Sequence, residues 1–349
     1  MSGSLTLTIL TPEEWPRVSG GFADLETVQT ATYSEAAARR VGARTEYVAV
    51  RDGTGAVRAA ASLRIREVPG LGAGIAWIAS GPLTRPLAGP PPEGDELAAI
   101  LGLLRDHARA SGHVLRLRLP VTAGHDPAGL DRLAEAQGFA PTARAPSYRT
   151  VLVDLLQDEE ALMAGLHGKW RNALRGALRA GLSVECIPFG SAPARFGALY
   201  DEVKNAKGFS VDIPPEFYER LKGSDFRHDL LIATKDGTDL AAFSLGRSGS
   251  TMVYLFGGTA AAGRAVNAGH FVMWQAILHG RAEGFTTLDL GGIDPEANPT
   301  VARFKQRTGG ADVQAPGPWE YRPPGLRPAL VGLAETLHRR WISRRRGAA

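Results

Sequence analysis

The sequence has few of the residues that mark several common classes of protein. Its 349 residues include one cysteine, Cys186, so no disulfide can form within the chain and a reducing compartment is expected. No apolar run reaches the roughly 18 residues that a transmembrane helix needs. The first residues lack the basic and apolar regions of a signal peptide. These absences together predict a cytoplasmic protein.

Motifs of several enzyme classes are also missing. The eight histidines show no metal-ligand spacing and have no cysteine partners, so no metal site is predicted. There is no P-loop, no G-x-G-x-x-G dinucleotide-binding fingerprint and no G-x-S-x-G nucleophile elbow. The sequence therefore lacks the usual support for an NTPase, a dehydrogenase or an α/β-hydrolase.

What the chain does contain is one order of elements written twice. In the first half we expect a helix at 27–40, followed by strands and helices at 46–50, 57–66, 74–78, 95–110 (helix), 114–119, 127–137 (helix) and 148–155. In the second half they follow at 228–234, 240–246, 251–256, 267–283 (helix), 286–290 and 299–306 (helix). The repeat predicts two tandem copies of one α+β domain with a mixed sheet, and the length of the chain also favours two domains.

A strongly amphipathic segment, 159–182, lies between the two copies and is predicted to be one helix. Its apolar stripe consists of Leu162, Leu166, Trp170, Leu174 and Leu178. Arg171, Arg175 and Arg179 follow at the same spacing, about 6 Å apart on one face, and no acidic residue lies three or four positions from any of them. The arginine row is either an exposed helix face or a surface that binds anions.

The most informative stretch runs from 251 to 310. It reads as a strand (TMVYLFGG), a helix, a second strand (TTLDLGGID) and the segment VARFKQRTGG. A strand–helix–strand crossover places two strands in parallel, and such sheets hold their sites at the carboxyl ends of the strands. The glycine pairs 257–258 and 291–292 end the two strands, so we expect the backbone to approach a ligand closely there.

The motifs VYLFGGT, LDLGGID and RFKQRTGG resemble the signature of the FemABX aminoacyltransferases, the peptidoglycan bridge-forming or lipid II amino-acid transferases. The segments Gln29-Thr30 with Tyr33, IASGPL (78–83) and GKWRNALRGALRAGLSVE (168–185) agree with that resemblance, which covers roughly residues 25–322. It implies two tandem GNAT-like domains flanking a cleft. We expect residues 1–155 to form the acceptor-side domain, 156–322 the donor-side domain and 323–349 a basic amphipathic helix docked on the first domain.

The resemblance also implies a reaction. An aminoacyl group would move from aminoacyl-tRNA to an amine, such as that of the stem peptide of a UDP-linked or lipid-linked peptidoglycan precursor, with no further cofactor. Lys305 would stabilise negative charge near the tRNA 3′ end, Phe304 would offer a stacking surface and Tyr254 would donate a hydrogen bond. Asp289 would be either a general base or the cap of a neighbouring backbone segment. The expected substrate-binding residues are Lys169, Arg171, Arg175, Lys204, Lys207, Gly257, Gly258, Gly291, Gly292 and Arg303.

Two departures from the family pattern concern the acceptor. Cell-wall members of the family usually carry a lysine a few residues after the early aromatic residue, where this chain has Ala36 or Ala37, with Arg39 and Arg40 slightly later. Lys207 stands before Gly-Phe, where an arginine is more usual, and a lysine lacks the bidentate fork of a guanidinium. Both departures weaken the expectation of a peptidoglycan precursor as acceptor.

Two other functions fit the same sequence. One is an acyl-CoA-dependent N-acyltransferase whose pyrophosphate would bind backbone amides in the loop 263–269, although the glycines there do not follow the usual R/Q-x-x-G-x-G/A spacing. The other is a tRNA- or membrane-binding protein with an inactive site, against which the intact glycine pairs and Phe-Lys motif argue.

The C-terminal tail is strongly basic. From Arg322 to the end it contains seven arginines and one acidic residue, Glu335, whereas the net charge of the whole chain is +4. Its apolar residues form a helical stripe of Leu330, Leu333, Leu337 and Trp341. A basic amphipathic helix of this kind either lies on an anionic membrane surface or docks on the protein itself.

Overall fold

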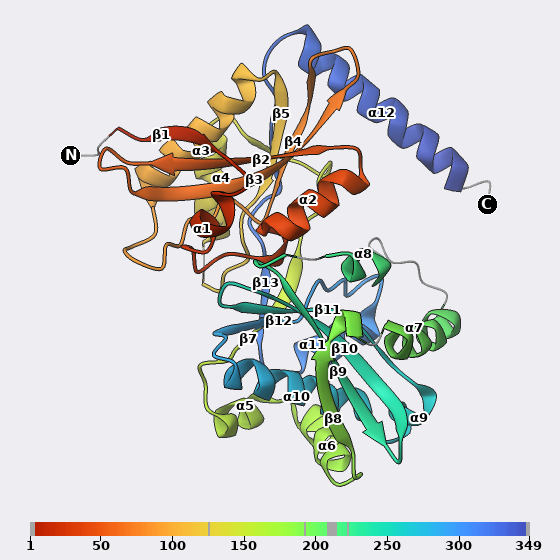
Figure 1. Ribbon diagram of the computed structural model, residues 1–349. Coiled ribbons are helices and arrows are strands. Elements are labelled where there is room, and N and C mark those ends of the chain that lie inside the picture. The colour runs from red at the N-terminus through yellow and green to blue at the C-terminus, as the bar shows by residue number, and fades with distance from the viewer. Residues whose placement is uncertain (1–3, 125, 192, 208–214, 222, 347–349) are drawn as a thin grey trace. The chain divides into compact units, whose positions relative to one another are not determined.

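The computed structural model describes residues 4–124, 126–191, 193–207, 215–221 and 223–346, and it forms two compact units (Figure 1). Unit 1 consists of Met1–Ser147 and Ala315–Ala349, and unit 2 of Tyr148–Gln314. These bounds differ from the sequence-based boundaries at 155/156 and 322/323. The strand at Arg149–Asp154, before the first predicted boundary, belongs to unit 2. The strand at Trp319–Tyr321, before the second predicted boundary, belongs to unit 1 together with the C-terminal tail.

Unit 1 is built on a seven-stranded sheet in the order β1-β2-β3-β4-β5-β14-β6. All neighbouring strands are antiparallel except β4 and β5, which are parallel and are joined by helix α3 (Gly94–Ala110). The strands are β1 (Thr6–Leu10), β2 (Arg44–Arg51), β3 (Val57–Val68), β4 (Ala73–Ala79), β5 (His113–Arg118), β14 (Trp319–Tyr321) and β6 (Ala140–Pro141). The predicted order of three strands, a helix and a fourth strand is therefore present as β2, β3, β4, α3 and β5.

Alternation along these strands separates two faces of the sheet. One face packs its leucines, isoleucines and valines against α3 and α4 (Pro127–Ala136), and each such residue, when fully buried, contributes about 1.5–3 kcal/mol. On the other face, α2 (Ala31–Arg40) packs on β2 and β3, and α12 (Leu326–Arg346) packs on β4 and β5. The tail therefore docks on the sheet of unit 1.

The predicted helix 27–40 begins later than expected. Residues Thr27–Gln29 form a 3₁₀ turn, Thr30 is extended, and its hydroxyl caps α2 by accepting a hydrogen bond from the backbone N–H of Tyr33. A threonine in this position favours the start of a helix because it satisfies one of the free amides of the first turn. The start of α2 is thus fixed by a cap.

Unit 2 repeats the architecture of unit 1. Its sheet has the order β13-β7-β12-β11-β10-β9-β8, in which β8 to β11 form an antiparallel meander, and α10 (Ala268–Ala282) joins the parallel strands β11 and β12. The strands are β13 (Ala311–Gln314), β7 (Arg149–Asp154), β12 (Thr287–Asp289), β11 (Thr251–Thr259), β10 (Thr238–Ser248), β9 (Arg227–Lys235) and β8 (Ser183–Pro188). In both units a strand from outside the local repeat, β14 or β7, completes the sheet beside the crossover strand.

The single helix predicted at 159–182 is wrong, because the segment forms two helices. They are α5 (Glu159–Gly165) and α6 (Gly168–Leu178), separated by Leu166 in extended conformation and by His167, whose side chain accepts a hydrogen bond from Lys169 N. Glycines on both sides of the break weaken a continuous helix. The apolar stripe is buried as predicted except for Leu178, which is exposed at the end of α6.

The described part of unit 2 also contains the α-helices α7 (Pro193–Lys207), α8 (Pro215–Glu219), α9 (Ala261–Ala265) and α11 (Pro299–Gln306). The last of these has the predicted bounds, with Pro299 in its first turn and Asn298 capping it through Val301 N. Among the described residues, no helix is both long enough and apolar enough to span a bilayer.

Candidate functional site

The candidate site lies in unit 2, where β11 and β12 part. The two strands pair only over Thr251–Val253 and Thr287–Asp289, after which β12 ends and β11 continues to Thr259. The turn after β12 passes close to β11. Gly291 has a φ of 72°, and a Cβ at this position would lie 2.4 Å from the carbonyl oxygen of Tyr254. Only glycine fits this backbone approach.

Lys305 of α11 holds that turn. Its Nζ donates to the carbonyl oxygens of Gly291 at 3.2 Å and Gly292 at 3.0 Å, and it lies 5.0 Å from the centroid of the Tyr254 ring. The lysine is only 5% exposed. The sequence predicted roles for Lys305, Tyr254 and the second glycine pair at one site, and the structure brings these residues into direct contact. The two carbonyls and the ring face together surround the ammonium group.

Burial sets the charge state of this lysine. Loss of hydration lowers the pKa of Lys305 to about 8, and the negative charge of Asp289 partly opposes that shift. The amine therefore keeps its proton at neutral pH but loses it roughly two pH units earlier than a free lysine. Two of its three N–H groups bind the glycine carbonyls, which leaves one for another acceptor.

Asp289 ends β12 beside the glycine turn and is 4% exposed. Its carboxylate accepts hydrogen bonds from the Thr150 hydroxyl, from Gly291 N at 2.8 Å and from the Tyr148 hydroxyl at 2.9 Å. Burial raises the pKa of Asp289, and these three hydrogen bonds lower it. Of the two roles that the sequence left open for this aspartate, this geometry corresponds to a cap of the neighbouring backbone.

Tyr254 packs its ring edge-on against Phe243 at 4.8 Å. Burial raises the pKa of its hydroxyl, so the phenol stays protonated as a donor. A Cβ at Gly257 would lie 2.8 Å from this hydroxyl oxygen and 2.6 Å from the Phe243 ring. Gly257 and Gly258 lie near the end of β11, as the strand TMVYLFGG predicted, and pair with Phe243 and Ala242 of β10. The first glycine pair thus makes room for Tyr254.

Phe304, the neighbour of Lys305, belongs to a triangle of rings. Its ring lies 5.8 Å from that of Trp170 on α6 and 5.1 Å from that of His270 on α10, and the rings of Trp170 and His270 lie 4.9 Å apart. Burial lowers the pKa of His270, so its imidazole is neutral at pH 7. The triangle packs α6 and α11 against the first turn of α10.

The arginine row is not part of this cluster. Arg171 donates to the carbonyl oxygens of Ala164 at 3.0 Å and Leu166 at 2.8 Å, which closes the end of α5. With the exposed Arg175 it lines a pocket of about 590 Å³ whose other walls are Glu159, Glu160, Met163 and Ala164. Two acidic residues of α5 therefore line the same pocket as the two arginines of α6. The pocket is lined by α5 and α6 alone.

The remaining predicted contacts are at the surface or outside the described residues. Lys169 and Arg303 are exposed. The side chains of Lys204 and Lys207 lie outside the described part of the chain. Four residues of the cluster were missed by sequence reasoning: Tyr148, Thr150, Trp170 and His270. Tyr148 and Thr150 were placed on the predicted strand 148–155, which was assigned to the other domain; Thr150 lies on β7 and Tyr148 directly before it.

Comparison with known proteins agrees with this architecture. Residues 168–306 match the family model of an acetyltransferase (GNAT) domain. No curated protein sequence matches the chain significantly. Among solved structures, that of FemX superposes with a TM-score of 0.78 at 16% identity and covers 94% of this chain and 99% of its own.

Two further structures share the fold. One is the C-terminal domain (DUF2156) of a putative lysylphosphatidylglycerol synthetase from Agrobacterium fabrum, with a TM-score of 0.50, 13% identity, and coverage of 89% of this chain and 91% of its own. The other is a conserved protein of unknown function from Bacteroides thetaiotaomicron, with a TM-score of 0.54, 11% identity, and coverage of 91% and 99%. The solved structures confirm the predicted tandem GNAT-like fold, and the match to the acetyltransferase domain model lies within its second copy.

Proposed function

We propose that this chain, an acyltransferase with the FemX-like tandem GNAT fold, is a tRNA-dependent aminoacyltransferase of the FemABX type. Its donor would be an aminoacyl-tRNA, and its acceptor an amine such as that of the stem peptide of a peptidoglycan precursor. One observation carries the proposal. The FGG, LDLGG and RFK motifs meet as a buried Lys305–Gly291–Gly292–Tyr254 cluster at the parting of two parallel strands, inside the segment that matches an acyltransferase domain.

The proposed reaction forms one C–N bond and breaks one C–O bond. The neutral amine of the acceptor attacks the ester carbonyl of the aminoacyl-tRNA, giving a tetrahedral oxyanion and a positively charged nitrogen. Collapse of this intermediate releases the 3′ oxygen of the tRNA, which takes up the proton that the nitrogen loses. The remaining N–H of Lys305 is the donor suited to the oxyanion, because a positive charge in a buried site acts with little screening. The Tyr254 hydroxyl would be a second, neutral donor.

The match to an acetyltransferase domain favours a second candidate, an acyl-CoA-dependent N-acyltransferase. A CoA pyrophosphate would need free backbone amides at the start of α10. In this chain α6 packs on that turn through Trp170 and His270, and a Cβ on Gly263 of the preceding loop would lie 2.2 Å from Leu240 O. This packing ranks acyl-CoA below aminoacyl-tRNA as the donor.

A donor assay separates the two candidates. The purified chain is incubated with radiolabelled aminoacyl-tRNA or acetyl-CoA, and with UDP-linked or lipid-linked peptidoglycan precursors as acceptors. We expect label to move from aminoacyl-tRNA, and the rate to fall sharply in Lys305→Ala but not in Lys235→Ala, which removes a half-buried lysine of β9 in the same unit. Transfer from acetyl-CoA alone would reverse the ranking. Measured tRNA binding without turnover across the panel would favour the inactive binding protein.

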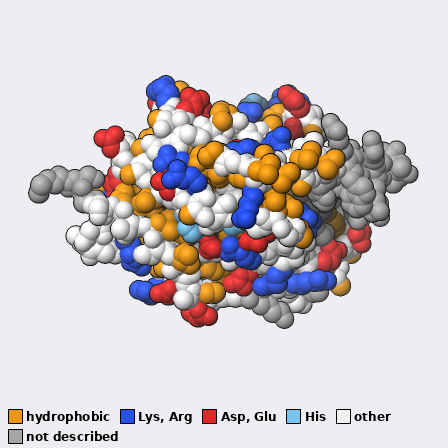
Figure 2. Space-filling view, turned by 90° about the horizontal axis from the view of Figure 1, so that it is seen from above, with side chains coloured by type: hydrophobic (Ala, Val, Ile, Leu, Met, Phe, Trp, Pro, Cys, Tyr) orange, Lys and Arg blue, Asp and Glu red, His pale blue; other side chains and the backbone are white. Residues whose placement is uncertain are grey.

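We also propose that α12 contacts an anionic membrane surface. Val331 is buried against unit 1, and Glu335 binds Arg116 there, while the other side of the helix carries four exposed leucines: Leu326, Leu330, Leu333 and Leu337. Hydrophobic side chains gather on the face of the molecule shown in Figure 2. The predicted residue Trp341 and the arginines beyond it lie outside the described side chains. Flotation with phosphatidylglycerol vesicles should capture the chain, and Leu333→Glu/Leu337→Glu should abolish capture; equal capture of both would remove the membrane contact.

A further inference from the structure

A charged row crosses the sheet of unit 1 on the face that carries α2 and α12. The strand registers place Thr45, Arg64, Trp77, Arg116 and Glu320 side by side on β2, β3, β4, β5 and β14. Because α2 packs on β2 and β3 while α12 packs on β4 and β5, the middle of the row lies between the two helices (Figure 1). Arg64 and Trp77 occupy this middle, and both are half-buried.

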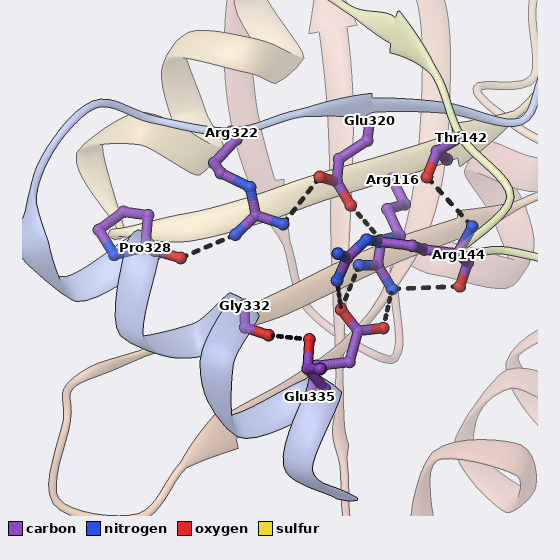
Figure 3. Close-up of polar contacts among 9 residues, drawn as sticks. Arg116, Thr142, Arg144, Glu320, Arg322, Pro328, Gly332 and Glu335 are labelled. Carbon is purple, nitrogen blue, oxygen red and sulfur yellow. Dashed lines mark hydrogen bonds and ion pairs between the residues drawn. The ribbon is translucent and has the colours of Figure 1, made fainter. Parts of the chain in front are cut away.

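The two arginines of the row differ in their partners. Arg116 is fully compensated: it binds Glu320 at 2.7 Å, Glu335 at 2.7 Å and the carbonyl oxygen of Arg144 at 3.3 Å (Figure 3). Arg64 makes no hydrogen bond and no ion pair with any residue that the structure describes. The Arg116 guanidinium therefore has a structural role, whereas the Arg64 guanidinium has no anionic partner among the described residues.

Leaving Arg64 uncompensated costs free energy. Burial lowers the pKa of Arg64, the positive charge of Arg40 on α2 lowers it further, and Tyr33 opposes both. A partly desolvated cation is normally paired within the protein, so a cation kept in this state indicates a ligand that supplies the charge.

The surroundings define the class of that ligand. A guanidinium binds two oxygens of one oxyanion through parallel N–H groups. Trp77 stands directly opposite Arg64 on the next strand, where Cβ atoms of paired residues lie about 5 Å apart. Its half-exposed indole offers a flat apolar surface beside the charge, and Ile75 and Ala79 continue this surface along β4.

We propose that Arg64 and Trp77 form a binding site for a phosphate-type oxyanion carried by the acceptor. The assignment of the ligand to the acceptor rests on the proposed function, whereas oxyanion binding itself does not. Arg66 provides a matched control. It lies two residues further along the same face of β3, is exposed, and sits opposite Ile75 instead of Trp77.

The test measures binding of inorganic pyrophosphate to the full-length chain by calorimetry at constant ionic strength, without tRNA. We expect Arg64→Gln to lower the affinity at least tenfold, Arg66→Gln to leave it within twofold, and Trp77→Phe to abolish the fluorescence change on binding. Equal affinity in Arg64→Gln, or an equal loss in Arg66→Gln, would overturn the proposal. A site that binds malonate but not pyrophosphate through Arg64 would overturn the phosphate assignment.

Two controls keep these outcomes interpretable. Thermal unfolding of Arg64→Gln should be unchanged or shifted upward, because the substitution removes an uncompensated charge. Arg64→Lys keeps the charge without the fork and should bind with intermediate affinity. Loss of pyrophosphate binding in Arg64→Gln, combined with no aminoacyl transfer by the unsubstituted chain, would support this site and refute the proposed function.

Discussion

The buried lysine makes the stability of unit 2 depend on pH in a way that can be calculated. The pKa of Lys305 is about 8 in the folded chain, against an ordinary value of 10.5. Because the folded state binds the proton more weakly than the unfolded state, the charged lysine destabilises the fold below pH 8, and stability rises as the pH increases toward 10.5. A pKa difference of 1 corresponds to about 1.36 kcal/mol, so the full effect is about 3 kcal/mol, of which about 2 kcal/mol is recovered between pH 7 and pH 9.5.

Lys305→Met removes the ionisable group and keeps a side chain of similar length. We compare the unfolding free energies of the unsubstituted chain and of Lys305→Met at each pH. Relative to the variant, the unsubstituted chain should be about 2 kcal/mol more stable at pH 9.5 than at pH 7. Pulse proteolysis in urea, with peptides of unit 2 quantified by mass spectrometry, measures this difference for unit 2 separately. Lys169→Met, at an exposed position, should show no such gain. A constant difference between the chain and Lys305→Met at the two pH values would refute the burial argument for Lys305.

Two further substitutions test the packing of each unit. Gly291→Ala should cost about 2–4 kcal/mol of unfolding free energy, measured by thermal or urea unfolding, because it adds a clash with Tyr254 O to a left-handed backbone. The control Gly284→Ala has a similar φ but open space around it, so it should cost about 1–2 kcal/mol. Equal costs would contradict the claim that the backbone at Gly291 approaches β11 too closely for a side chain. Glu335→Gln removes a negative charge beside the buried Arg116, so it should cost about 3 kcal/mol of unfolding free energy and expose α12 to proteolysis. The control Glu135→Gln, at an exposed site on α4, should change neither quantity measurably. A stable Glu335→Gln variant with a protected α12 would show that the Arg116–Glu335 ion pair does not anchor the helix.

The elements that could be predicted are those with a strong local signal. Alternating apolar residues located β3 and β5, and the Pro-x-x-x-x-Phe-Lys segment after Asn298 located α11 with its bounds. The repeated order of strands and helices then indicated two copies of one domain, because each copy buries its own sheet faces. These features depend on residues close together in the sequence.

The features that were missed depend on contacts between distant segments. Strand β14 has only three residues and no alternation of its own, and it forms by pairing with β5, about 200 positions earlier. Strand β7 was expected, but its assignment to the first domain removed Tyr148 and Thr150 from consideration at Asp289. The alternation of apolar and polar residues along a strand does not indicate which sheet the strand joins.

At the candidate site, too, local motifs could be recognised from the sequence, whereas contacts between distant segments could not. The glycine pairs, Lys305 and Tyr254 could be identified from their motifs, but the inward orientation of Lys305 is set by two carbonyl groups on another segment. The arginine row was read as unpaired because no acid is near it within its helix, whereas Arg171 binds the end of α5. Arg64 carried no motif at all, and its lack of a partner among the described residues emerges only from the folded sheet.

The central claim, that Lys305 serves aminoacyl transfer from tRNA, is tested most directly by a single-turnover assay. Radiolabelled aminoacyl-tRNA is mixed with excess enzyme and an amine acceptor of the peptidoglycan-precursor class, and formation of the peptide product is followed for the unsubstituted chain, Lys305→Met and Lys235→Met. We predict product formation that slows by about 10²–10³-fold in Lys305→Met, the typical effect of removing an oxyanion-stabilising donor, and remains within about twofold in Lys235→Met, at the end of β9. Transfer by Lys305→Met at the unsubstituted rate would contradict the account.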